Sequence, residues 1–210
     1  MQSFFITFEG ADGGGKSTQL KFLAATLVKL GYKVIATREP GGTALAEEVR
    51  RIVLDAALPL TNATQVLLYL AARNEHVDKV IRPALAEGMI VLCDRFSDST
   101  LVYQGYSAGA DKEQLEQLEL LNAYATGGLN PDLTLVLDGR PRVLAERRRA
   151  RGITDRYEEQ GLKLQDKLRQ GFLALAAKEP KRIKVIDAEG TMEEVQRCVL
   201  AAVLKLLKRD

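Results

Sequence analysis

Residues 10–17 read Gly-Ala-Asp-Gly-Gly-Gly-Lys-Ser, which is the G-x-x-x-x-G-K-[ST] spacing of a phosphate-binding loop. Many backbone N–H groups must face one anion in such a loop, and residues without a Cβ let the chain wrap that closely. Lys16 can place its ammonium on the outer phosphates, and Ser17 can offer a hydroxyl to Mg²⁺. The alternative to a phosphate site is an ordinary glycine-rich turn that happens to be followed by Lys-Ser. The apolar run before the loop and the helical pattern after it favour a triphosphate site, without identifying the reaction.

A second candidate group, Asp94, closes the apolar run 89–94. A carboxylate at the C-terminal end of a buried strand stands where ligands bind in open α/β sheets. Asp94 is therefore predicted to join the Mg²⁺ shell, through water, because Mg²⁺ keeps much of its hydration. An aspartate that caps a turn is the alternative. Arg95 follows directly, and an Asp-Arg pair at a phosphate site is better explained by chemistry than by solvation.

Arginines are concentrated at 147–151, where the chain reads Arg-Arg-Arg-Ala-Arg, with Arg156 close behind. A solvated basic face is one interpretation. The other is a lid over residues 142–160, because phosphoryl transfer spreads charge over the oxygens of the moving group and arginines can stabilise it. We expect at least one of these arginines to be catalytic, with Arg147 and Arg151 foremost.

Composition narrows the class of protein. The chain has 210 residues, of which 46% are hydrophobic, and this suits one domain spanning residues 1–210. A net charge of +2 gives no bulk attraction to nucleic acid. No apolar stretch approaches the roughly 18 residues of a membrane span, and Cys93 and Cys198 are too few for a disulfide framework. We expect a cytoplasmic protein that binds neither nucleic acid nor membranes.

Apolar, β-branched runs alternate with helical patterns along the chain. Because the runs are apolar almost throughout, they indicate strands buried on both faces of a parallel sheet. Strands are expected at 4–8, 33–37, 89–94, 133–138 and 183–187. Helices are expected at 16–30, at 64–87 with Pro83 as a kink or a second start, from a cap at Asp111 to about 125, at 140–151, at 160–177, and from a cap at Thr191. The alternation predicts a doubly wound α/β fold, with five parallel strands and helices on both faces.

Two further segments have weaker signals. The run Arg38-Glu39-Pro40 follows the second strand and cannot continue it, so Arg38 is expected to contact a ligand or anchor the loop. A cis bond before Pro40 is left open, since about 5% of X-Pro bonds are cis. His76 is the only histidine and has no evident partner in the sequence, and we interpret it as a surface or half-buried residue.

Together these segments resemble the thymidylate kinase family along essentially the whole chain. The resemblance depends on four motifs in the family's order: 8–18, 38–43, 94–100 with 103–105, and 147–152. It implies transfer of the γ-phosphoryl group of ATP to dTMP with Mg²⁺, in a homodimer. Because 13–15 are glycines and the lid is rich in arginine, the chain is similar to the members whose catalytic arginine lies in the lid.

The resemblance also implies roles for single residues. The ATP side would comprise Gly10, Ala11, Asp12, Gly13, Gly14, Gly15, Lys16, Ser17 and Thr18, with Ser17 and Asp94 toward the metal. Asp12 and Lys16 would act in catalysis, and Arg95 would bind the acceptor phosphate. The dTMP side would add Arg38, Glu39, Pro40, Arg50, Tyr69, Arg73, Thr100, Tyr103 and Gln104.

Within that set, Tyr69 would stack on thymine, Arg73 would donate to a base carbonyl, and Thr100 would bond the ring N–H. Tyr103 would crowd the place of a 2′-hydroxyl. Arg38 and Glu39 would lie near the acceptor and the metal. The loop 187–191 is expected at the edge of the adenine.

Two alternatives differ in class. Another nucleoside monophosphate or deoxynucleoside kinase would share the loop and the lid. A nucleotide switch, such as a GTPase or a partition ATPase, would need only the loop. No Asn-Lys-x-Asp segment for reading guanine occurs in the chain, and a switch has no need of arginines facing a second anion.

Overall fold

The computed structural model describes residues 3–149 and 161–208, apart from the side chains of residues 148 and 149. In this part of the chain five strands form one parallel sheet in the order β2-β3-β1-β4-β5. The strands are β1 (Phe4–Glu9), β2 (Val34–Arg38), β3 (Ile90–Asp94), β4 (Leu133–Asp138) and β5 (Ile183–Asp187). The predicted doubly wound α/β fold is confirmed, and each strand begins and ends within one residue of its expected limits.

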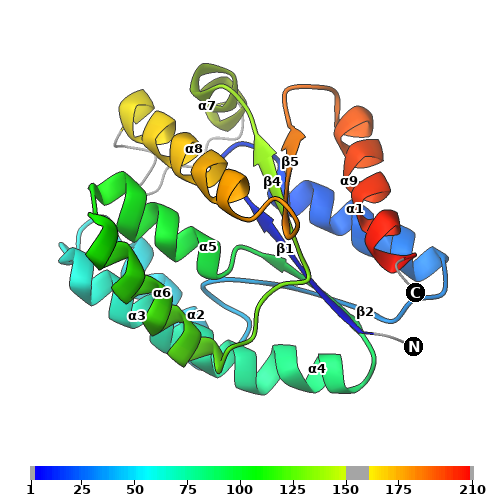
Figure 1. Ribbon diagram of the computed structural model, residues 1–210, viewed down its shortest axis with the longest axis horizontal. Helices are drawn as coiled ribbons and strands as arrows, with labels where there is room; N and C mark the ends of the chain where they lie inside the picture. The colour runs from blue at the N-terminus through cyan, green and yellow to red at the C-terminus, as the bar shows by residue number, and fades with distance from the viewer. Residues whose placement is uncertain (1–2, 150–160, 209–210) are drawn as a thin grey trace.

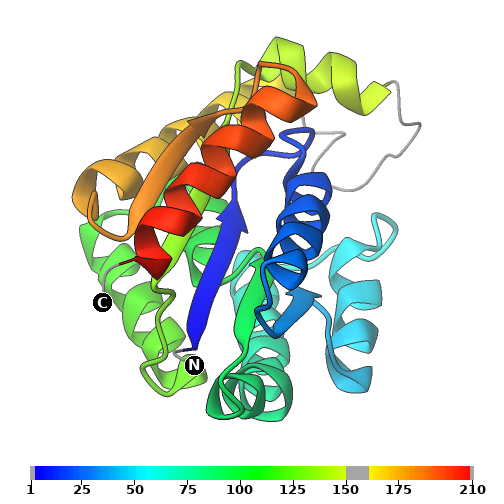
Figure 2. The same cartoon turned by 90° about the vertical axis from the view of Figure 1, so that its right-hand side faces the viewer.

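Helices cover both faces of this sheet (Figures 1 and 2). They are α1 (Lys16–Lys29), α2 (Ala44–Leu54), α3 (Asn62–His76), the π-helical η1 (Val77–Ile81), α4 (Arg82–Ala86), α5 (Ser97–Thr100), the π-helical η2 (Leu101–Gly105), the 3₁₀ turn η3 (Tyr106–Ala108), α6 (Lys112–Thr126), α7 (Pro141–Arg149), α8 (Gly161–Lys178) and α9 (Met192–Leu207). Helices α1 and α9 lie together on one side, whereas α4, α5, α6 and α8 lie on the other. None of the described helices is long and apolar enough to cross a membrane.

The central strand β1 joins two hydrophobic cores, because alternate side chains of a strand point to opposite faces. Phe4, Ile6 and Phe8 pack with the buried leucines of α1 and the buried valines of α9. Phe5 points the other way and meets Phe96 edge-on, with ring centroids 4.8 Å apart. Because β1 is buried on both faces, its position along the neighbouring strands is fixed, and so is the point at which the following loop begins.

The carboxyl ends of the strands meet at one edge of the sheet. The parallel register pairs both Phe8 and Arg38 with Asp94, and it pairs Asp138 with Asp187. The loops after β1, β2 and β3 therefore leave the sheet side by side. This edge holds nearly all of the side chains that the sequence singles out.

The helical region after residue 60 differs in detail from the expectation. Thr61 caps α3 by accepting the N–H of Thr64 at 3.2 Å, and the helical run continues through η1 into α4. Pro83 lies in the first turn of α4, directly after the π-helical turn, so the second segment expected at Pro83 is an α-helix that follows η1 without a break.

Helix α2 was not predicted. Thr43 caps it by accepting the N–H of Ala46 at 3.1 Å, and Ala46, Val49 and Val53 form its buried face. The spacing of these apolar residues was the signal in the sequence, but the Arg38–Gly42 run before them obscured it. This helix follows directly on the loop after β2, so it anchors one side of the site.

Both predicted capping boxes are present, and one of them gives a stability test. Asp111 accepts the N–H of Gln114 at 2.9 Å, and the Gln114 side chain accepts the N–H of Asp111 at 3.0 Å. Asp111→Ala is expected to lower the free energy of unfolding by about 1 kcal/mol, because an N–H at the start of α6 loses its partner. Urea denaturation would measure it, with the exposed mid-helix change Gln117→Ala as the control. Equal midpoints for the two variants would contradict the capping role.

Candidate active site

The loop between β1 and α1 packs tightly against the end of β4. Gly10 has φ +123°, and a Cβ there would lie 2.5 Å from the carbonyl oxygen of Leu137. Lys16, the first residue of α1, folds its Nζ back onto the carbonyl oxygens of Gly10 and Ala11, each at 3.0 Å. Burial, and then the charge of Arg95, lowers the pKa of Lys16. The predicted phosphate-binding loop and its lysine are thus brought together at the N-terminus of a helix.

Ser17 and Asp94 meet across this loop. The Ser17 hydroxyl donates to Asp94 Oδ2 at 2.5 Å, although 77 positions separate the two residues in the chain. Hydroxyl and carboxylate oxygens are the ligands that Mg²⁺ prefers. Among the described residues no group of three or more His, Cys, Asp or Glu could hold a metal by itself. The pair therefore suits an Mg²⁺ ion that takes its other ligands from phosphates and water.

Arg95 occupies the centre of the site. Its backbone has φ +73°, a left-handed conformation that is uncommon outside glycine. Its Nη2 donates to Asp12 Oδ1 at 2.6 Å and to the hydroxyl of Tyr103 at 2.9 Å, and its Cζ lies 4.9 Å from the centre of the Tyr103 ring. Lys16 Nζ is 3.6 Å from the same Asp12 oxygen. Two cations and one carboxylate thus converge where a donor and an acceptor phosphate could meet.

Glu9 is a functional residue that the sequence did not reveal. It is fully buried, its Oε1 accepts the N–H of Phe96 at 2.7 Å, and its Oε2 accepts the hydroxyl of Ser99 at 2.6 Å. These bonds tie the end of β1 to the turn that carries Arg95. Burial and the carboxylate of Asp98 raise the pKa of Glu9 to about 7. In the sequence Glu9 is only a polar residue that ends an apolar run.

A buried guanidinium lies on the far side of the same turn. Arg73, in α3, is 3% exposed and uses four of its N–H groups within the protein. Its Nη1 donates to Thr100 Oγ1 at 2.9 Å and to Asn122 Oδ1 at 2.5 Å, and its Nη2 donates to the Phe96 carbonyl at 3.0 Å. Tyr69 lies one helical turn before Arg73. The structure thus joins predicted Arg73 and Thr100, and adds Asn122, which was missed.

The prediction for His76 was wrong. The ring is fully buried, its Nδ1 lies 3.0 Å from Glu39 Oε1, and its Nε2 lies 2.7 Å from Thr37 Oγ1. Glu39 is 5% exposed and accepts the Nε–H of Arg73 at 2.7 Å with its other oxygen. Its carboxylate therefore points into the protein, where both oxygens have partners, and does not face the surface of the site. The Glu39–Pro40 bond is cis.

The other predicted dTMP-side residues hold the loops in place. Arg38 Nη2 donates to both carboxylate oxygens of Glu47 at 2.9 Å, so it anchors the loop to α2. Arg50 Nη1 donates to the carbonyl of Pro40 at 3.0 Å. Gln104 is buried in η2, and its main-chain carbonyl accepts a hydrogen bond from the side-chain amide of Asn62.

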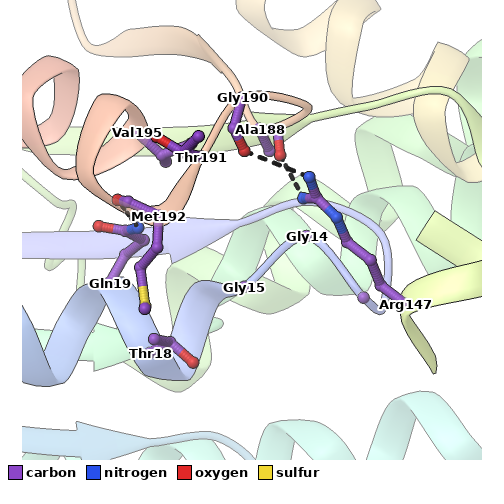
Figure 3. Close-up of a pocket in the computed structure, with 11 residues that line it drawn as sticks. Gly14, Gly15, Thr18, Gln19, Arg147, Ala188, Gly190, Thr191, Met192 and Val195 are labelled. Atoms are coloured by element: carbon purple, nitrogen blue, oxygen red, sulfur yellow. Dashed lines mark hydrogen bonds between the residues drawn. The ribbon is translucent and has the colours of Figure 1, made fainter. Parts of the chain in front are cut away.

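A pocket of about 290 Å³ lies between the phosphate-binding loop and the loop after β5 (Figure 3). Gly13, Gly14, Gly15, Thr18, Gln19, Arg147, Ala188, Gly190, Thr191, Met192 and Val195 line it. The guanidinium of Arg147 crosses from α7 and donates to the carbonyls of Ala188, Glu189 and Gly190. Arg147 therefore forms a wall of this pocket. Arg151 and the rest of the predicted lid from 150 to 160 lie outside the described residues.

Comparison with known proteins decides the family. The family model described as thymidylate kinase matches residues 8–199. The thymidylate kinase of Symbiobacterium thermophilum is 47% identical, over 99% of this chain and 95% of that protein. The chain belongs to the thymidylate kinase family. A second thymidylate kinase, from Synechococcus sp. (strain JA-3-3Ab), is 52% identical over 91% of this chain and 90% of its own.

A solved member of the thymidylate kinase family has the same fold. The crystal structure of thymidylate kinase from Ehrlichia chaffeensis is 35% identical and superposes with a TM-score of 0.79, covering 97% of this chain and 99% of that chain. The predicted family and fold are confirmed.

The buried carboxyl of Glu9 gives a test of pH dependence. Its pKa of about 7 in the folded state exceeds the ordinary 4.5, so the folded protein holds this proton more tightly than the unfolded chain. Its stabilising contribution is present below pH 4.5 and is lost as the pH rises to 7. Relative to Glu9→Gln, the natural protein should lose up to roughly 3 kcal/mol of unfolding free energy between pH 5 and pH 8. Parallel curves from urea titrations would refute this.

Proposed function

We propose that this chain transfers the γ-phosphoryl group of ATP to dTMP, giving dTDP, by in-line transfer between two bound nucleotides. The observation that carries the proposal is that Lys16 and Arg95 both approach one carboxylate oxygen of Asp12, Lys16 at 3.6 Å and Arg95 at 2.6 Å. A donor phosphate bound by Lys16 and an acceptor phosphate bound by Arg95 would lie end-on to one another. Positioning and charge neutralisation supply most of the rate in such reactions.

On the donor side, the N–H groups of residues 13–18 and the ammonium of Lys16 would hold the polyphosphate. The pocket in Figure 3 would take the adenine, since it opens directly beside that loop. Ser17 and Asp94 would hold Mg²⁺ at the same edge. When bound, the ion neutralises charge on the phosphate oxygens.

On the acceptor side, Arg95 would bind the phosphate of dTMP, with Asp12 and Tyr103 holding the guanidinium in place. Arg73 has one N–H of Nη2 beyond the four that its neighbours accept, and that donor would meet a carbonyl of thymine. Thr100 would reach the ring N–H. Tyr69 would stack on the base, as a planar apolar ring can.

We further propose one kinase domain over residues 1–210, with a lid at 142–160, working in the cytoplasm without nucleic acid. Arg147 is fixed on the adenine side by its three carbonyl partners. This leaves Arg151 as the foremost candidate for the transferring phosphoryl group.

The test is a panel of acceptors with Mg-ATP. We expect dTMP to be phosphorylated well ahead of dCMP, dGMP and thymidine, with almost no ATP hydrolysis when no acceptor is present. Lys16→Ala should reduce transfer by roughly 100-fold or more, because the donor phosphates lose their cation. Equal rates with several acceptors would favour another nucleotide kinase. Acceptor-independent hydrolysis would favour a nucleotide switch.

A homodimer is also proposed. Helix α6 exposes an apolar stripe, with Leu120 71% and Tyr124 87% exposed, and α3, which packs against it, exposes Leu67. Exposed apolar stripes of this kind suit contact with a second copy of the chain.

The dimer is checked by sedimentation equilibrium. The natural protein should sediment at twice the 23.1 kDa of the chain, whereas Tyr124→Glu should shift it toward the single mass because a charge is buried at the contact. Val28→Glu, at a 57% exposed apolar position on α1, is the matched control. A natural protein that sediments as a single chain would contradict the dimer.

A further inference from the structure

A row of buried polar groups lies behind Arg73. It runs from Thr37 through the ring of His76 and the carboxylate of Glu39 to the Nε of Arg73, with successive distances of 2.7, 3.0 and 2.7 Å. His76 is fully buried, Arg73 is 3% exposed and Glu39 is 5% exposed. The row joins the end of β2 and the loop after it to helix α3.

The carboxylate of Glu39 depends on both of its partners. A buried carboxylate oxygen without a hydrogen-bond donor is costly in free energy. Arg73 donates only to Oε2 of Glu39. Oε1 depends on the ring of His76. Since a carboxylate accepts, the ring nitrogen that faces it must carry the proton, and that nitrogen is Nδ1. Without this donor Glu39 would turn toward water or other donors, and the guanidinium would lose the one of its four partners that binds Nε, while Thr100, Asn122 and Phe96 still hold Nη1 and Nη2.

The backbone around the ring leaves little room for another arrangement. Gly42 has φ +86°, and a Cβ there would lie 2.5 Å from His76 Cδ2 and 2.6 Å from Nε2. The loop that carries Glu39 is therefore packed directly on the ring. Helix α3 holds His76 three residues after Arg73, so the two side chains lie on neighbouring parts of one helix surface.

We propose that His76 is a positioning residue for pyrimidine recognition: by donating to Glu39, it fixes the guanidinium of Arg73 so that its remaining N–H meets the thymine carbonyl. The inference rests on the base contact proposed above for Arg73. It assigns a function in substrate selection to the only histidine of the chain, which touches no substrate itself.

Two substitutions of His76 test the contacts of its two ring nitrogens separately. The amide of His76→Asn places an N–H near the position of Nδ1 and keeps a donor for Glu39, whereas that of His76→Gln reaches the position of Nε2 and keeps only the contact with Thr37. We expect His76→Gln to raise the KM for dTMP roughly tenfold, with kcat and the KM for ATP little changed. His76→Asn should stay within about threefold of the natural enzyme. The preference for dTMP over dCMP should fall with His76→Gln only.

Controls distinguish the inference from the proposal on which it rests. Arg73→Lys tests the base contact itself: an unchanged KM for dTMP would overturn that contact, whatever the histidine variants do. If Arg73→Lys weakens dTMP binding and His76→Gln does not, the positioning role is wrong. Val203→Ala, at a fully buried site between α1 and α9, should lower stability without changing the KM for dTMP. Equal defects in both histidine variants would indicate a merely structural role.

A spectroscopic measurement tests the geometry without any variant. Because the chain has one histidine, ¹⁵N labelling of histidine gives one pair of ring nitrogen signals. The nucleotide-free protein should show a proton on Nδ1 that exchanges slowly with water, as expected of a buried hydrogen bond. A ring protonated only at Nε2 would overturn the inference, since Nδ1 could not then donate to Glu39.

Discussion

Buried ionisable side chains that each need hydrogen-bond partners determine how the carboxyl edge of this sheet is built. Glu9, Glu39 and Arg73 are almost inaccessible to water, and moving an ion out of water is costly unless opposite charges or N–H groups replace the solvent. Here the replacements come from elements far apart in the chain. Glu9 is served by the turn after β3, and Glu39 is served by α3. The turn after β3 and the loop after β2 are therefore tied to distant elements for the same electrostatic reason.

The wall of the pocket beside the phosphate-binding loop is built by a different means. Arg147 binds three main-chain carbonyls of the loop after β5, and Arg140 forms a two-pronged ion pair with Glu189 in the same loop. Arg140 directly precedes α7 and Arg147 lies within it. Helix α7, which leads into the proposed lid, is thus tied to the loop that lines the pocket.

Local pattern was enough to predict much of this molecule. The five strands, the strand and helix on either side of the glycine-rich loop, and both capping boxes depend on residues that are neighbours in the sequence, and the structure confirms each of them. The pairing of Ser17 with Asp94 follows from a general property of parallel sheets, whose carboxyl ends meet at one edge. Helix α2 was not predicted because the Arg38–Gly42 run directly before it has the pattern of a loop. The family resemblance supplied the dTMP-side residues.

The rest could not be predicted because it depends on contacts between distant residues. Nothing near His76 in the sequence shows that Glu39 and Thr37 will be its neighbours, so it seemed to have no partner. The role of Glu9 could not be predicted for the same reason, since its hydrogen-bond donors lie almost ninety positions away in the sequence. Asn122 is an ordinary helical residue until the packing of α6 against α3 places it on Arg73.

Phe96 links Glu9, next to the turn of Arg95, to the guanidinium of Arg73 through its own backbone. Its N–H donates to Glu9, beside Arg95, its carbonyl accepts from Arg73, and its ring lies 5.3 Å from the Arg73 guanidinium. The N–H and the carbonyl of one residue, whose ring is packed against Phe5, thus set the spacing between the turn that carries Arg95 and the guanidinium of Arg73. With dTMP bound between the two arginines as proposed, this spacing would set the length of nucleotide that contacts both, and a longer or shorter acceptor would lose one of the two contacts.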